Sequence, residues 1–131
     1  AAYFAGHPNV KGMFAVDAGG TAAVGKTMSE NKLQSKGVHG GGFDLLPATL
    51  DYVQKGDLDF TIDQQPYLQG FYTVMVLFLY KISGGLTGPS EINTGLSYLT
   101  KANVEPFIKS ESRYQGNSSE QKVVTRTGPI G

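Results

Sequence analysis

The spacing of apolar and polar residues along the chain alternates between the pattern of strands and the pattern of helices. Three segments have the length of strands: an apolar run at 10–16, an unusually glycine-rich segment at 36–43, and positions 58–62, which alternate strictly between apolar and polar. Segments 21–31 and 48–55 carry apolar residues at helical spacing. Strands that alternate with helices predict an α/β fold with a parallel sheet. The alternating strand 58–62 is expected to be half-exposed, at a sheet edge or in a crossover.

The segment 66–83 predicts a long helix that is apolar on nearly every side. Such a helix needs burial on more than one face. Its densest apolar run, 71–80, is far shorter than the about 20 residues that a bilayer span requires. We therefore expect a buried core or interface helix. A short strand at 96–100 and a short helix at 103–109 follow it, and polar residues dominate from 110 onward.

Three polar residues stand where predicted strands end, namely Asp17, Asp44 and Gln64. Open α/β folds place ligand contacts at the carboxyl ends of their strands, so these side chains are expected to converge on one small polar ligand. Carboxylates accept hydrogen bonds and an amide both donates and accepts, which suits sugar hydroxyls. The alternative is that each residue only caps the helix that follows it, because Asp is a favourable N-cap.

Composition narrows the function classes. The 131 residues suffice for one domain, and the eleven basic and eleven acidic residues cancel, which leaves no electrostatic footprint for nucleic acid. The chain has no cysteine, and neither His7 nor His39 has a partner at metal-ligand spacing. Carboxylates and an amide without an activated nucleophile indicate binding and not catalysis. We expect no enzyme, no cofactor and no metal.

The segment Gly20–Thr27 matches the phosphate-loop pattern G-x-x-x-x-G-K-[ST] letter for letter, after a strand and at the start of a helix. This match supports a rival function, a nucleotide-binding module. Against it, the four residues between Gly20 and Gly25 include no glycine and favour a continuous helix over a phosphate cradle. The alternative without a nucleotide is an ordinary strand-to-helix turn whose Lys26 faces solvent.

Several segments resemble the C-terminal part of ribose- and galactose-type periplasmic sugar-binding proteins. They are 8–15, Gly42-Phe43-Asp44, 56–66 with Gly70, and 99–104. The similarity runs from about 5 to 104. It implies an incomplete, flavodoxin-like three-layer αβα lobe of a two-lobed protein that traps a monosaccharide by hinge closure. Such proteins are substrate-binding components of bacterial ABC-type sugar uptake systems, act with a membrane permease, and work in the periplasm or at the cell surface.

The resemblance also assigns roles to residues. It implies that Asp44 accepts hydrogen bonds from sugar hydroxyls and that Gln64 contacts the sugar from a hinge crossover. Asp17 occupies a position often held by asparagine. A second rival shares the fold, the effector-sensing domain of a sugar-responsive transcriptional repressor. It would need an upstream DNA-binding segment.

The same resemblance predicts the organisation of the chain. Residues 1–63 would belong to the second lobe, 64–95 to a hinge crossover and a first-lobe helix, 96–115 to the return crossover, and 116–131 to a mobile tail. Most of the first lobe would lie upstream, so this chain would carry half of the cleft. We expect weak or no sugar affinity for the chain alone, and either homodimerisation or association with a missing N-terminal fragment.

Overall fold

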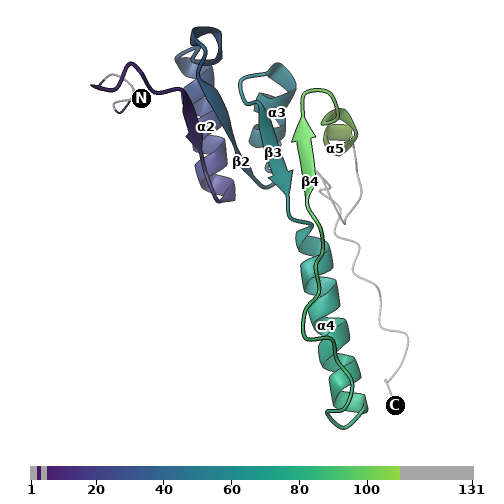
Figure 1. The fold of residues 1–131 in the computed structure, drawn as a ribbon. Helices are drawn as coiled ribbons and strands as arrows, with labels where there is room; N and C mark the ends of the chain where they lie inside the picture. The colour runs from purple at the N-terminus through teal and green to yellow at the C-terminus, as the bar shows by residue number, and fades with distance from the viewer. Residues whose placement is uncertain (1–2, 4–5, 110–131) are drawn as a thin grey trace.

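A four-stranded sheet organises the protein (Figure 1). The computed structural model describes residue 3 and residues 6–109. Its strands β1 (Gly12–Phe14), β2 (His39–Phe43) and β3 (Phe60–Asp63) run parallel, and β4 (Ser97–Thr100) is antiparallel to β3, in the order β1-β2-β3-β4. The α/β class is confirmed.

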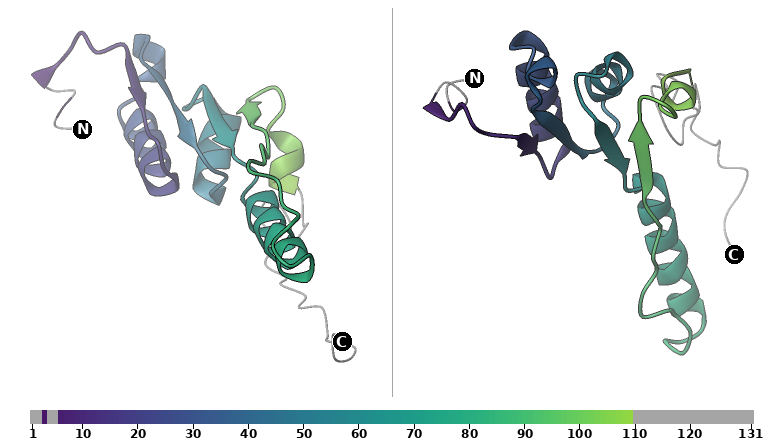
Figure 2. Two further views of the ribbon diagram at one scale, coloured as in Figure 1. Left: turned by 60° about the horizontal axis from the view of Figure 1, so that its bottom comes forward. Right: turned by 45° about the horizontal axis from the view of Figure 1, so that its top comes forward.

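Helices α2 (Ala18–Glu30), α3 (Pro47–Lys55) and α5 (Glu105–Lys109) all lie on one side of the sheet (Figures 1 and 2). The 3₁₀ turn η1 (Gln34–Lys36) joins α2 to β2. Right-handed crossovers that step in one direction along a sheet put their helices on the same face. The described residues therefore supply two of the three layers of an αβα lobe.

The hydrophobic core fills the space between this helical layer and the sheet. Its buried members come from α2, α3, β4 and the connecting segments: Val24, Met28, Leu33, Val38, Leu50, Val53, Leu58, Leu99 and Val104. Pro47 stands in the first turn of α3, and Gly56 ends that helix with a left-handed φ of 86°. Both termini follow the usual asymmetry of proline at the start and glycine at the end.

The glycines of β2 allow neighbours to approach from both sides. A Cβ at Gly42 would lie 2.1 Å from Thr21 Oγ1 of α2, and a Cβ at Gly41 would lie 2.6 Å from the Phe60 ring. Any larger residue would push the helix or the ring off the strand. The unusual glycine content of this strand thus follows from close packing on both faces.

Aromatic side chains cover the sheet face that carries no described helix. The Phe60 ring stacks between Phe14, at a centroid distance of 5.9 Å, and Tyr98, at 4.8 Å. Phe14 and Tyr98 remain 61% and 56% exposed. This face is apolar and largely open.

Strand β3 is half-exposed, as expected, but it does not lie at a sheet edge. It pairs with β2 on one side and β4 on the other, so it lies inside the sheet and not at its edge. Its buried residues are the polar Thr61 and Asp63, whereas Phe60 and Ile62 are only half-buried. The alternation is real, but the polar face of the strand is the one turned inward.

Helix α4 (Pro66–Ile82) projects away from the sheet and its covering helices (Figure 1). It has no buried residue, so within the described part of the chain it is not a core helix, whereas its exposed apolar surface is what the interface alternative predicts. Leu77 is 63% exposed and Phe78 is 50% exposed. Among the described residues, no helix is long and apolar enough to cross a membrane.

Candidate functional site

Asp44 and Gln64 meet at one edge of the sheet. Asp44 directly follows β2 and Gln64 directly follows β3. Because these strands are neighbours and parallel, their carboxyl ends lie side by side. The Gln64 Nε2 donates a hydrogen bond of 2.9 Å to Asp44 Oδ1, and both residues are half-buried. The structure thus brings these two of the three predicted side chains together.

The backbone of Asp44 adopts an unusual conformation. Its φ is 74°, in the left-handed region that residues with a side chain rarely occupy. Two hydrogen bonds hold it there: its N–H donates to Ile62 O at 2.8 Å, and its carbonyl accepts from Thr61 Oγ1 at 2.7 Å. Such conformations cost about 1–3 kcal/mol and cluster at functional sites. Hydrogen bonds thus hold the backbone that carries the Asp44 carboxylate in an unfavourable left-handed conformation.

Gln64 lies where the chain leaves the sheet for α4. Its carbonyl accepts from Gln69 Nε2 at 2.8 Å and from Thr94 Oγ1 at 3.3 Å. Thr94 belongs to the segment that returns from α4 to β4, so both connections between α4 and the sheet meet at this one carbonyl. The next residue, Gln65, is left-handed at φ 56°. Gln64 therefore occupies the junction of the two connections.

Asp17 does what the capping alternative predicts. It is the N-cap of α2, and its Oδ1 accepts from Gly20 N–H at 2.8 Å. Within the described residues, no hydrogen bond joins its side chain to Asp44 or Gln64. Its carbonyl accepts from Thr21 Oγ1 at 2.7 Å, and this hydroxyl in turn accepts from Phe43 N–H at 2.9 Å. One buried hydroxyl therefore ties the backbone at Asp17 to the end of β2.

The phosphate-loop match is part of a continuous helix. Residues 20–27 all lie within α2, so their N–H groups form no cradle. Lys26 Nζ lies 3.8 Å from Glu30 Oε1, and Thr27 Oγ1 donates to Ala23 O at 2.9 Å. A Cβ at Gly25 would lie 2.3 Å from the Tyr52 ring, which explains that glycine by packing. The nucleotide-binding alternative is wrong for this segment.

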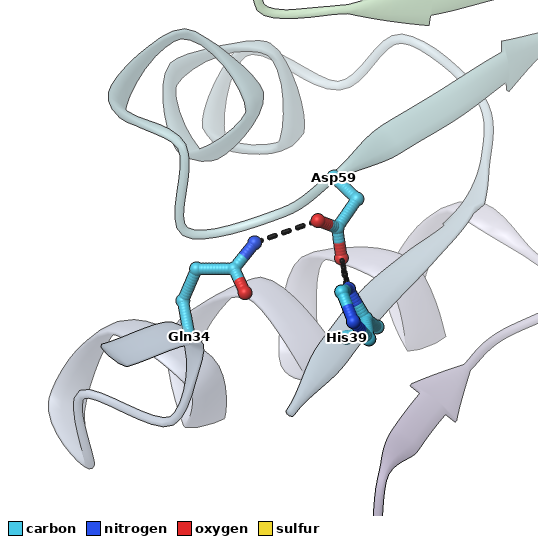
Figure 3. A network of polar contacts seen from close by, with 4 residues as sticks. Gln34, His39 and Asp59 are labelled. Carbon is cyan, nitrogen blue, oxygen red and sulfur yellow. Dashed lines mark hydrogen bonds and ion pairs between the residues drawn. The ribbon is translucent and has the colours of Figure 1, made fainter. Parts of the chain in front are cut away.

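A polar cluster fixes the opposite edge of the sheet, at the amino ends of β2 and β3 (Figure 3). Asp59 accepts from Gln34 Nε2 at 2.7 Å and Gly40 N–H at 2.8 Å, and its Oδ2 lies 3.2 Å from His39 Nδ1. Burial disfavours the charged carboxylate, but these hydrogen bonds outweigh it and lower the pKa of Asp59. Among the described residues, no group of three or more His, Asp or Glu is arranged to hold a metal.

Two buried side chains next to Asp44 and Gln64 are not singled out by the sequence. Thr61 and Asp63 both sit on the buried face of β3 and bond to the site's backbone. The available signal was a polar residue at every second place of a strand that ends in a candidate ligand. Alternation by itself predicts a half-exposed strand and does not say which face is buried.

A groove of about 630 Å³ runs along one face of α4, away from Asp44 and Gln64. Its lining is almost entirely apolar: Pro66, Tyr67, Gly70, Phe71, Val74, Met75 and Phe78. It belongs to the helix that has no buried residue.

Comparisons with known proteins identify relatives. A family model described as a periplasmic binding protein domain matches residues 1–84. The chain is 49% identical over 129 residues to the xylose/arabinose-binding protein XylF of Sulfolobus acidocaldarius, a match that covers 95% of this chain and 32% of the relative.

Solved structures agree. A carbohydrate transporter solute-binding protein from Agrobacterium radiobacter, in complex with D-arabinose, matches with a TM-score of 0.69 and 29% identity, over 78% of this chain and 34% of that chain. A putative LacI transcriptional regulator from Bacteroides fragilis matches with a TM-score of 0.64 and 25% identity, over 79% of this chain and 35% of that chain.

The chain thus spans about a third of the length of these relatives. The similarity to sugar-binding proteins inferred from the sequence is confirmed, and the family model covers well over half of the chain. The chain belongs to the periplasmic binding protein domain family.

Proposed function

We propose that this chain forms one wall and part of the hinge of a monosaccharide-binding cleft, in the solute-binding component of an ABC-type sugar transporter. The observation that carries the proposal is the hydrogen bond between Asp44 and Gln64 at the carboxyl ends of β2 and β3. Ligands of open α/β folds bind at this edge. The relative with 49% identity is named for binding xylose and arabinose, which favours a pentose.

The chemistry of the two side chains suits a sugar. The Asp44 carboxylate accepts hydrogen bonds from hydroxyls, and the Gln64 amide can donate to one ring substituent and accept from another. Asp17 stands at the end of the neighbouring strand β1, and we keep it as a third candidate contact. Its exposed carboxylate can accept from a hydroxyl while it caps α2.

The hinge role rests on the position of Gln64. Its carbonyl accepts hydrogen bonds from Gln69 of α4 and from Thr94 of the segment that returns to β4, so a rotation of α4 against the sheet would act directly on a ligand-contacting residue. This supports the division in which residues 1–63 belong to one lobe and the helix of 64–95 belongs to the other. Residues 96–115 would return to the first of these, although 110–115 lie outside the described residues, as does the segment 116–131.

Further partners follow from the same proposal. The other wall of the cleft would come from a complementary lobe, and the chain alone would bind sugar weakly or not at all because it makes only part of the contacts. The apolar surface of α4 would be covered by that lobe or by a second copy of the chain. A membrane permease would receive the sugar, and the protein would work in the periplasm or exported to the cell surface without acting as an enzyme.

Calorimetric titration with xylose and arabinose tests the proposal, in a protein that carries this chain together with its complementary lobe. Replacing Asp44 by Ala removes a charged hydrogen-bond acceptor and should cost about 2 kcal/mol of binding free energy, roughly a thirtyfold loss of affinity. Asp51→Ala is the matched control, because it removes an exposed α3 carboxylate that pairs with Lys55. Unchanged affinity in Asp44→Ala would remove Asp44 from the site.

The effector-sensing domain of a repressor is the second candidate, and the likeness to a putative LacI regulator supports it. The 49% identity to a sugar-binding protein favours transport. Sugar-dependent binding to an operator DNA, measured with the full-length protein, would favour the repressor instead.

A further inference from the structure

Strand β3 buries two polar side chains. Thr61 is 0% exposed and Asp63 is 1% exposed, whereas the apolar residues between and beside them lie on the more open face. Burial of polar groups is costly unless they are hydrogen-bonded. A valine or leucine at either place would be the ordinary choice for a core, so these residues call for an explanation in the bonds that they make.

Each of the two side chains bonds to the backbone of a left-handed residue. Thr61 Oγ1 donates to the carbonyl of Asp44, whose φ is 74°. Asp63 Oδ1 accepts from the N–H of Gln65 at 2.8 Å, and the φ of Gln65 is 56°. Only one other non-glycine residue in the described part of the chain, Lys32, has a positive φ. The buried pair therefore serves two of the three strained positions.

We propose that Thr61 and Asp63 are positioning residues for the sugar-binding pair, an inference that rests on the proposed function. Thr61 holds the Asp44 backbone in the conformation that directs its carboxylate toward Gln64. Asp63 holds the Gln65 turn and thereby fixes Gln64, the residue between them. The hydrogen bond between Gln64 and Asp44 is the product of these two supports.

A merely structural role would make a different prediction. If Thr61 and Asp63 contributed only to the stability of the fold, their loss would lower stability and leave the contact between Gln64 and Asp44 intact. Under the proposal, their loss releases that contact. The chain offers a matched control in Thr49, which is also 0% exposed but whose Oγ1 has no hydrogen-bond partner among the residues that the structure describes. Thr49→Val removes a buried hydroxyl on another element, α3, and breaks no hydrogen bond to Asp44 or Gln65.

The first readout is the side-chain amide NMR signal of Gln64 in this chain without sugar, assigned by its disappearance in Gln64→Ala. Thr61→Val and Asp63→Ala should each move this signal toward its position in Asp44→Ala, where the acceptor is gone. Thr61→Ser keeps a hydroxyl and Asp63→Asn keeps an accepting oxygen, so both should leave the signal near its original place, as should Thr49→Val.

A Gln64 signal that stays in place in Thr61→Val and Asp63→Ala, while the unfolding temperature falls, would overturn the proposal. If Asp63→Ala fails to fold, Thr61→Val still decides, because it preserves the shape of the side chain and removes only the donor. This readout needs no sugar. A failure of the positioning role is therefore distinguishable from a failure of the proposed function.

The second readout is a double-mutant cycle on sugar affinity in the protein that includes the complementary lobe. Thr61→Val should lower affinity about tenfold alone and have little further effect in the Asp44→Ala background, because residues that act through one contact are non-additive. Equal losses in both backgrounds would contradict the proposal. Absence of any sugar binding in the unmodified protein would refute the proposed function and leave the NMR result standing.

Discussion

Helices α2 and α4 differ in how much of their surface is buried. Helix α2 contains glycines, alanines and threonines, yet Thr21, Val24, Gly25 and Met28 are buried against the sheet and α3. Helix α4 is far richer in aromatic and aliphatic residues and buries none of them. Topology, more than apolar content, therefore decides which helix surface is covered. The crossovers bring α2 onto the sheet, whereas α4 leaves it and needs a partner surface.

The difference in burial between the two helices is tested by replacing one methionine in each. Met28 of α2 is 0% exposed and Met75 of α4 is 39% exposed. In this chain, Met28→Ala should lower the free energy of unfolding by about 2–5 kcal/mol, because it leaves a cavity in the core. Met75→Ala should cost well under 1 kcal/mol. Urea unfolding followed by circular dichroism measures both.

An equally large loss in Met75→Ala would mean that α4 is buried in solution, most simply between two copies of the chain. Sedimentation of the chain at several concentrations would then show a dimer. A monomer with equal losses would contradict the placement of α4 itself.

A second pair of substitutions compares a glycine from each helix. Gly25→Ala in α2 brings a Cβ within 2.3 Å of the Tyr52 ring and should destabilise by about 1–3 kcal/mol through overpacking. Gly70→Ala in α4 meets no atom within 4 Å and should be neutral or stabilising by up to about 1 kcal/mol through helix propensity. Thermal unfolding of both variants checks the opposite signs. Equal signs would show that the two helices do not differ in packing.

A smaller effect concerns the stability of the sheet and its covering helices at acid pH. The folded-state pKa of Asp59 is lowered by its hydrogen bonds, so this carboxylate stabilises the fold above its ordinary range near pH 4. That contribution is lost as the pH falls through the lowered pKa. Asp59→Asn should therefore reduce stability at neutral pH by about 1 kcal/mol, the usual net contribution of a hydrogen bond. It should also make the loss of stability at acid pH less steep when the free energy of unfolding is measured against pH.

Asp51→Asn provides the control for this pH series. Asp51 pairs with Lys55 on the surface of α3, where solvent screens the ion pair and leaves it little effect on stability. Its curve should follow that of the unmodified chain. Parallel acid limbs in Asp59→Asn and the unmodified chain would show that Asp59 does not couple to the fold.

Local sequence signals predicted most of the elements. Pro47 and Gly56 marked the ends of α3, and the strand-end positions of Asp44 and Gln64 predicted their meeting. Alternation in 58–62 revealed a strand but not which of its faces the helices cover, since that depends on crossover direction. The burial of Thr61 and Asp63 was missed for this reason. The cap at Asp17 also began α2 earlier than its apolar spacing suggested.

The most direct test of the central claim follows the Gln64 side-chain amide by NMR while arabinose and xylose are titrated into the protein that carries this chain and its complementary lobe. The account predicts a saturable shift of this signal that is abolished in Asp44→Ala and retained in Asp51→Ala. A Gln64 signal that stays unmoved at saturating sugar, while signals elsewhere respond, would show that the sugar binds away from the Asp44 and Gln64 edge.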